Sequence, residues 1–339
     1  MPRRHLSERQ RERIRLLQER RRNRLQAHLA QTSADPDDDP IEAPPQPGRV
    51  MVRHGRDLAV EDAAGGLQHC VCRRSIGEPV CGDQVVWQAT GSDTGVVTAL
   101  LPRTTVLSRP DYSGRDKPLA ANVSLLIIVV APRPAPSGFL VDQYLVSAEL
   151  LGVQALLLCN KMDLLAGAEH ADFLAGFDHY QQIGYPLLAL SVRADPSAAA
   201  LRQRCANETA ILLGQSGVGK SSLVKALLPD QAVQIGRLSQ ATGLGRHTTS
   251  AATCYRLDRA GYLIDSPGVR SFRLGAIDRA TLQRGFREFQ PYLGRCRFRD
   301  CTHRNEPDCA LQAAVADGAI APLRLETFQQ LAAGLDTAY

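Results

Sequence analysis

Two short motifs limit what this chain can fold into, because they stand in an unusual order along it. Residues 160–163 read NKMD and residues 214–221 read GQSGVGKS. The second matches the phosphate-binding pattern GxxxxGK[ST], and the first matches the NKxD pattern that reads a guanine base. In ordinary domains of this kind the phosphate loop comes first. Here NKMD precedes it by about 50 residues, so either one match is accidental or the domain has been cut at a new place.

The phosphate-binding match has the local context that its chemistry needs. Apolar residues 210–213 predict a strand before the loop, and residues 220–227 predict a helix after it. Lys220 can reach the β- and γ-phosphates, and the Ser221 hydroxyl can bind Mg²⁺. The predicted contacts of this loop are Gly214, Gln215, Ser216, Gly217, Val218, Gly219, Lys220, Ser221 and Ser222.

The NKMD motif also follows a predicted strand, at residues 155–159, which places it at the edge of the sheet where such folds bind ligands. Asp163 can accept hydrogen bonds from N1–H and the 2-amino group of guanine. Adenine lacks that donor pair, so an ATPase is disfavoured. We expect Asn160 to hold the loop, the stem of Lys161 to cover the base, and Met162 to complete the binding segment.

A further base contact is predicted at Ser191, which directly follows a strand at residues 187–190. GTPases place a Ser-Ala loop here, whose backbone N–H faces O6 of guanine. This chain continues instead with Val192 and Arg193, so only the serine matches.

Two switch segments follow the phosphate-loop helix. Residues 245–250 read GRHTTS and supply a threonine for Mg²⁺, either Thr248 or Thr249, which composition does not distinguish. Residues 265–268 read DSPG. There Asp265 is expected to hold Mg²⁺ through a water molecule, and the Gly268 N–H to meet the γ-phosphate.

The complete set of motifs resolves the question of order. If the strands are numbered as in other GTPases, this chain runs fourth, fifth, sixth, first, second, third. Every motif keeps its own strand, and only the cut has moved, to a point just after DSPG. The sequence therefore predicts a circularly permuted domain, which is physically accessible when the old termini lie close together at the surface.

A cysteine-rich segment near the C-terminus predicts a metal site. Residues 296–309 read CRFRDCTHRNEPDC. Cys296, Cys301, His303 and Cys309 form a closed set of three thiolates and one imidazole, which is typical of one structural Zn²⁺. Arginines at 295, 297, 299 and 304 surround the ligands, and we expect this basic surface to meet phosphate. Cys70, Cys72 and Cys81 lack that grouping and are interpreted as structural.

Charge and turn patterns complete the domain plan. Ten arginines lie within residues 1–30, and an acidic, proline-rich stretch follows. Short β-rich pieces separated by glycine turns then predict an OB-type barrel. The predicted fold is multi-domain. Its parts are a basic arm and acidic, proline-rich linker (1–48), an OB-like barrel (49–116), a circularly permuted P-loop α/β GTPase domain (117–274) and a mostly helical zinc-binding domain (275–339). The barrel is either RNA-binding or only a spacer.

The N-terminus carries no apolar signal segment, and the longest apolar run, residues 123–131, is too short to span a membrane. We therefore expect a cytoplasmic protein with no membrane partner.

In its motifs and their order the chain resembles the RsgA/YjeQ family of circularly permuted GTPases, from about residue 49 onward. The resemblance rests on a barrel followed by NKMD, GQSGVGKSS, GRHTTS, DSPG and the Cys/Cys/His/Cys cluster. It implies GTP hydrolysis during late maturation of the 30S subunit, as a checkpoint or release step stimulated by that subunit. It also implies 16S rRNA binding through the barrel and the zinc domain. We expect a monomer that uses GTP and GDP with Mg²⁺.

The group that orients the attacking water is less evident. Many signalling GTPases have a glutamine directly after DxxG, but this chain has Val269. The nearest candidate in sequence is His247 in the first switch, and the alternative is that His247 is only a surface-loop residue. Two other functions stay open: an RNA scaffold in which hydrolysis is incidental, and a signalling GTPase with a protein partner.

Overall fold

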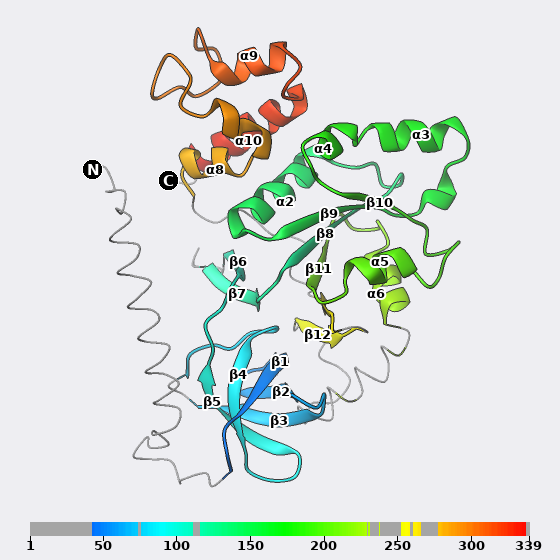
Figure 1. The fold of residues 1–339 in the computed structure, drawn as a ribbon, viewed down its shortest axis with the longest axis vertical. Helices are drawn as coiled ribbons and strands as arrows, with labels where there is room; N and C mark the ends of the chain where they lie inside the picture. Colours follow the sequence, from blue (N-terminus) through cyan, green and yellow to red (C-terminus); the bar gives the residue numbers. More distant parts are fainter. Residues whose placement is uncertain are drawn as a thin grey trace.

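The computed structural model describes residues 43–73, 76–110, 116–228, 252–257, 260–265 and 277–336, with residues 230 and 237. The predicted basic arm and the residues of both switch segments other than Asp265 lie outside this part. The described chain forms a barrel, a central α/β sheet and a helical C-terminal unit in a row (Figure 1).

The N-terminal unit is the predicted five-stranded barrel. β1 pairs with both β2 and β4, β2 pairs with β3, and β3 runs parallel to β5, so the sheet closes on itself in an OB-type order. Valines and Trp87 fill its interior because alternate strand positions point inward. The strands are β1 Gln46–His54, β2 Asp57–Asp62, β3 Leu67–Cys72, β4 Gln84–Ala89 and β5 Thr94–Leu100.

A two-stranded hairpin between the barrel and the α/β sheet was absent from the sequence prediction. It consists of β6 Val106–Pro110 and β7 Asp116–Ala121, which pair antiparallel. Each strand contains a proline, at 110 and 118. Proline removes a ladder donor and argues against a strand unless the strand lies at an edge, which explains the omission.

The central sheet confirms the circular permutation. Its strand order is β10-β9-β8-β11-β13-β12, and all neighbours are parallel except β12 and β13. In GTPase numbering this is the order 6-5-4-1-3-2 of one continuous sheet. The strands are β8 Leu125–Val130, β9 Gln154–Cys159, β10 Leu187–Ala189, β11 Thr209–Leu213, β12 Thr253–Arg256 and β13 Tyr262–Asp265.

The helices that flank this sheet are α2 Gly138–Leu151, α3 Ala168–Ala175, α4 Asp178–Gln182, α5 Ala199–Arg204 and α6 Lys220–Leu227. A short break separates two of them: α3 ends at Ala175, with Gly176 as its C-cap, and α4 begins at Asp178. The barrel joins the sheet directly, because β1 pairs with β12 at Val52 and Thr253.

The C-terminal unit is mostly helical, as predicted, and has its own core around Phe286, Phe289 and Phe328. It contains α8 Arg279–Arg284, a 3₁₀ helix η4 at Arg287–Tyr292, α9 Ala310–Ala316 and α10 Pro322–Asp336. Val146 of α2 belongs to the same core, so this unit is packed onto the GTPase sheet through α2. No helix in the described ranges has the length and apolar character needed to cross a membrane.

Candidate nucleotide and metal sites

The phosphate loop connects β11 to α6 as its sequence predicts. Leu213 ends the buried strand, and Lys220 opens the helix. Gly214 begins the loop with φ of 134°, and a Cβ there would lie 2.2 Å from the Val129 carbonyl oxygen of β8. Only glycine permits that approach. The Lys220 ammonium donates to the carbonyls of Gly214 and Gln215, each over 2.6 Å, and so lies along the loop itself.

The NKMD segment lies against this loop. β8 and β9 pair with Val130 opposite Cys159, so Asn160 emerges at the carboxyl edge of the sheet, where the phosphate loop also emerges. Asn160 is buried, and its Nδ2 donates to the Val218 carbonyl over 2.9 Å. Lys161 adopts a left-handed conformation with φ of 60°, and its ammonium donates to the carbonyl of Gly217. The two motifs that stand in reversed order therefore form one site.

A cavity of about 290 Å³ opens between these motifs. Its size lies near the lower end for a small-ligand pocket. The lining residues are Asn160, Lys161, Asp163, Leu164, Ser191, Val192, Arg193, Gly219 and Ser222, and we call this cavity the base pocket.

Ser191 and Asp163 meet inside the base pocket. The Ser191 hydroxyl donates to Asp163 Oδ1. This bond orients the carboxylate and leaves Oδ2 and the remaining lone pairs for a ligand. Asn160 Oδ1 is buried without a hydrogen-bond partner in the described part of the chain. Met162 is buried beneath the segment, so it supports the loop from below.

Of the predicted site residues in the two switch segments, the structure describes Asp265. Asp265 is the last residue of β13, a neighbour of the phosphate-loop strand β11. It therefore lies at the edge of the sheet that carries the phosphate loop. His247, Thr248, Thr249 and Gly268 fall outside the described residues, and their predicted roles stay predictions.

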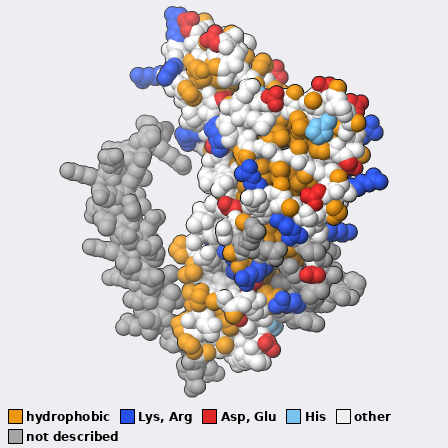
Figure 2. Space-filling model, turned by 45° about the vertical axis from the view of Figure 1, so that its right-hand side comes forward, with side chains coloured by type: hydrophobic (Ala, Val, Ile, Leu, Met, Phe, Trp, Pro, Cys, Tyr) orange, Lys and Arg blue, Asp and Glu red, His pale blue; other side chains and the backbone are white. Residues whose placement is uncertain are grey.

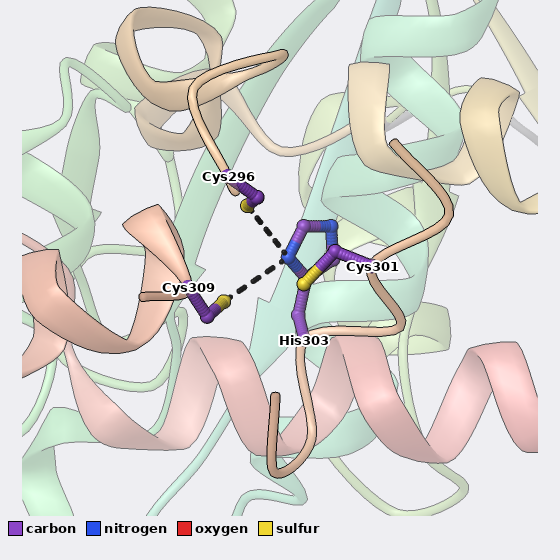
Figure 3. Close-up of side chains that lie close together, drawn as sticks. All are labelled: Cys296, Cys301, His303 and Cys309. Carbon is purple, nitrogen blue, oxygen red and sulfur yellow. Dashed lines mark hydrogen bonds between the residues drawn. The ribbon is translucent and has the colours of Figure 1, made fainter. Parts of the chain in front are cut away.

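The predicted zinc ligands come together in the C-terminal unit (Figure 3). The ligand atoms of Cys296, Cys301, His303 and Cys309 all lie within 4.8 Å of one another. Ligands of a tetrahedral zinc ion stand about 3.5–4 Å apart, given zinc–sulfur bonds near 2.3 Å. His303 Nδ1 lies 3.3 Å from Cys309 Sγ and 3.6 Å from Cys296 Sγ. This donor set fits one closed structural zinc site.

Protonation within the cluster also fits a metal. Burial lowers the pKa of His303, which favours the neutral imidazole that binds zinc. Burial raises the pKa of the Cys301 thiol to about 12, so a cation is needed to hold its thiolate. Among the described residues this is the one Cys/His group close enough to bind an ion. Cys70 and Cys72 are buried in the core of the barrel, and Cys81 is buried in the core of the central sheet.

Two supporting residues of the metal site were missed from the sequence. The Gln283 side-chain amide of α8 lies 2.9 Å from His303 Nε2, so it can fix the ring with Nδ1 facing the thiols. Glu306 accepts backbone N–H bonds from Thr302 at 2.7 Å and Arg304 at 2.9 Å, which holds the ligand loop closed. Glu306 could have been predicted as a supporting residue, because it stands between the ligands His303 and Cys309 in the sequence. Gln283 could not, because it reaches the site only through the packing of α8.

The segment around the metal site carries four arginines and three acidic residues, Asp300, Glu306 and Asp308. Arg295, Arg297, Arg299 and Arg304 are all exposed, and Phe298 among them is 42% exposed. Blue side chains project from this unit at the top of Figure 2. Arg297 has a carboxylate neighbour, Asp308, at 3.1 Å, which partly offsets its charge.

A permuted sheet with a phosphate loop, a guanine-reading segment and a Cys₃His cluster defines a circularly permuted GTPase with a metal-binding C-terminal unit. Comparison with known proteins agrees with this class. A family model described as RsgA GTPase matches residues 100–275. The chain belongs to the RsgA GTPase family and is a GTP hydrolase.

Named relatives cover nearly the whole chain. "Small ribosomal subunit biogenesis GTPase RsgA" of Pseudomonas aeruginosa strain LESB58 is 43% identical over 337 residues, which is 99% of this chain and 98% of the relative. The protein of the same name from Chromohalobacter salexigens is 45% identical over 300 residues, 87% of each chain.

Two solved structures share the fold. YjeQ from Thermotoga maritima has a TM-score of 0.72 and 28% sequence identity, and the match covers 87% of this chain and all of that one. YloQ, described as a circularly permuted GTPase, has a TM-score of 0.71 and 26% identity over 87% of this chain and 96% of its own.

Proposed function

We propose that this GTPase binds the 30S ribosomal subunit and hydrolyses GTP during late maturation of that subunit, as a checkpoint or release step. The observation that carries the nucleotide part is the bond from Asn160 to Val218, because it joins the base-reading and phosphate-binding motifs around one pocket. The names of the relatives support the small subunit as partner.

The nucleotide would be held from two sides. Asp163 would read the Watson–Crick edge of guanine, oriented by Ser191. Asn160 and Lys161 would form the wall that faces the phosphate loop, with Met162 supporting them from below. Backbone N–H groups of residues 214–222 would surround the phosphates. Mg²⁺ would be held by Ser221, by Asp265 through water, and by Thr248 or Thr249 of the first switch, with Gly268 at the γ-phosphate.

The outer units would supply the contacts with rRNA. The barrel and the exposed arginines around the zinc ligands support binding to 16S rRNA, because clustered arginines neutralise phosphates. The basic arm within residues 1–30 would add to this contact. We further propose that the protein is a cytoplasmic monomer, with the domain limits at residues 49–116, 117–274 and 275–339, and that the zinc ion is structural.

Asp163→Asn tests the assignment of the base. An amide presents one acceptor and one donor group, so it mispairs with guanine and matches xanthine. The affinity for GTP should fall roughly tenfold to a hundredfold, the usual effect of an unpaired polar group in a binding site, and the affinity for XTP should rise. Asp172→Asn makes the same chemical change on the exposed face of α3, away from the pocket, and should alter neither. Unchanged GTP affinity in Asp163→Asn would refute the assignment.

Steady-state turnover with 30S subunits, with 50S subunits and with neither tests the partner. Stimulation by 30S alone supports the proposal. Equal rates in all three would favour the alternative in which the protein is an rRNA scaffold and hydrolysis is incidental. Co-sedimentation in GDP and in a non-hydrolysable GTP analogue would show whether the nucleotide controls release.

A further inference from the structure

Arg193 lines the base pocket although it belongs to none of the nucleotide motifs. It follows Ser191 by two residues, in the place where this chain departs from the Ser-Ala pattern of other GTPases. Two residues of extended chain span at most about 7 Å. Arg193 therefore lies at the end of the pocket where Ser191 orients Asp163, which is the end that would hold the base.

The guanidinium of Arg193 is not engaged elsewhere in the described chain. The side chain is exposed, and among the described residues it has no hydrogen bond, ion pair or ring contact. It makes no ion pair with Asp163, although both residues line one cavity. Lys161, the other cation of this pocket, is held by the carbonyls of Gly217 and Arg133.

A planar cation beside a purine pocket suits one kind of contact best. Guanidinium groups stack on flat π-systems, and proteins use arginine planes in this way against nucleic-acid bases. A contact with phosphates is less suited to this position, since Lys220 and the glycine loop carry that part of the site on α6 and the loop before it. Asp163 is itself exposed, and a side chain over the base would shield its hydrogen bonds from water, which strengthens them.

We propose that Arg193 stacks on the face of the guanine base and is a binding residue for the purine ring rather than for its edge. This inference rests on the proposed guanine site. It gives a function to Arg193, which stands where this chain departs from the Ser-Ala pattern and which the nucleotide motifs do not explain. Asp163 then decides which purine is bound, and Arg193 adds affinity for any purine.

Separating the plane of the side chain from its charge tests the stacking contact. Dissociation constants for GDP, IDP and GTP would be measured by calorimetry for wild type, Arg193→Ala, Arg193→Lys and Arg193→Trp. Arg193→Ala should weaken all three nucleotides by the same factor, between about threefold and thirtyfold. Arg193→Lys keeps the charge but not the plane, and should lose most of that affinity. Arg193→Trp keeps a plane without charge and should retain it.

Arg204→Ala is the matched control, because it removes an exposed arginine of α5 that does not line the pocket. It should bind all three nucleotides as wild type does. Circular dichroism would show that each variant is folded.

Three results would overturn the proposal. Wild-type affinity in Arg193→Ala would show that Arg193 makes no contact with the nucleotide. Full affinity in Arg193→Lys, together with a greater loss of GTP than of GDP affinity in Arg193→Ala, would show a charge contact with phosphates. A change in the ratio of GDP to IDP affinity would show that Arg193 reads the base edge. If Asp163→Asn shifts the base preference while Arg193→Ala behaves as wild type, the stacking contact fails and the proposed function stands.

Discussion

The Asn160 side-chain amide donates to the Val218 carbonyl over 2.9 Å, and this bond closes a loop of 58 residues between the two nucleotide motifs. Gly219 lies against the same amide, and a Cβ there would lie 2.4 Å from Asn160 Nδ2. Glycine is therefore required at position 219 by the neighbouring NKMD segment as well as by the φ of 98° at this residue.

Gly219→Ala should weaken GDP binding by tenfold or more, because the new methyl group must displace Asn160 or shift the start of α6. An order-of-magnitude loss corresponds to about 1.4 kcal/mol, which is within the cost of a forced overpacking change. Calorimetric titration with GDP measures it. Gly167→Ala also places a methyl group at positive φ, but with nothing within 4 Å of it. That variant should bind GDP normally, and equal binding by both variants would contradict the steric argument.

Cys301→Ser should release the zinc ion and loosen the C-terminal unit without abolishing GDP binding. The four ligands lie within a separate core, so the folding energy that the metal supplies is local. Metal analysis and GDP titration of the purified variant provide the comparison. Cys72→Ser, at a buried thiol of the barrel, should keep the full zinc content. A folded wild-type protein that contains no zinc would contradict the structural-zinc assignment.

Arg324→Ala should destabilise the C-terminal unit by about 3–5 kcal/mol, the usual effect of leaving buried charges without their partner. Arg324 is 1% exposed. Its Nη1 lies 2.7 Å from Asp142 Oδ1 of α2, and its guanidinium also binds both carboxylate oxygens of Glu288. Urea denaturation, monitored through the release of zinc, would measure the loss of stability. Gln330→Ala on the exposed face of the same helix should change stability by less than about 0.5 kcal/mol. Similar stabilities for the two variants would show that the ion network contributes little.

His247→Ala should keep GTP and 30S binding but lose most of the subunit-stimulated rate, on the order of a hundredfold. The reason is that Val269 leaves no polar side chain to orient water, and His247 is the nearest candidate in the sequence. The basal rate should change much less. Turnover with and without 30S subunits, in wild type and variant, makes the test. Undiminished stimulation would assign His247 to an ordinary loop position.

Much of this architecture could be read from the chain because it is encoded locally. The strand, glycine loop and helix around GQSGVGKS follow one another directly in the sequence. The three cysteines and one histidine of the metal site all fall within residues 296–309. The barrel strands are short β-rich stretches separated by glycine turns. Even the permuted order is a property of the sequence, since each motif keeps its own strand when the cut moves.

Other features depended on contacts between residues far apart in the chain. No local pattern shows that Gln283 reaches His303, that Arg324 is buried against Asp142, or that Arg193 lines the base pocket. The β6–β7 hairpin was missed because its prolines contradict local strand preference, while its pairing is satisfied within the fold. Short-range patterns follow from backbone and side-chain preferences that act over a few residues. The partner of a buried charge or a second-layer ligand is chosen when whole elements pack together.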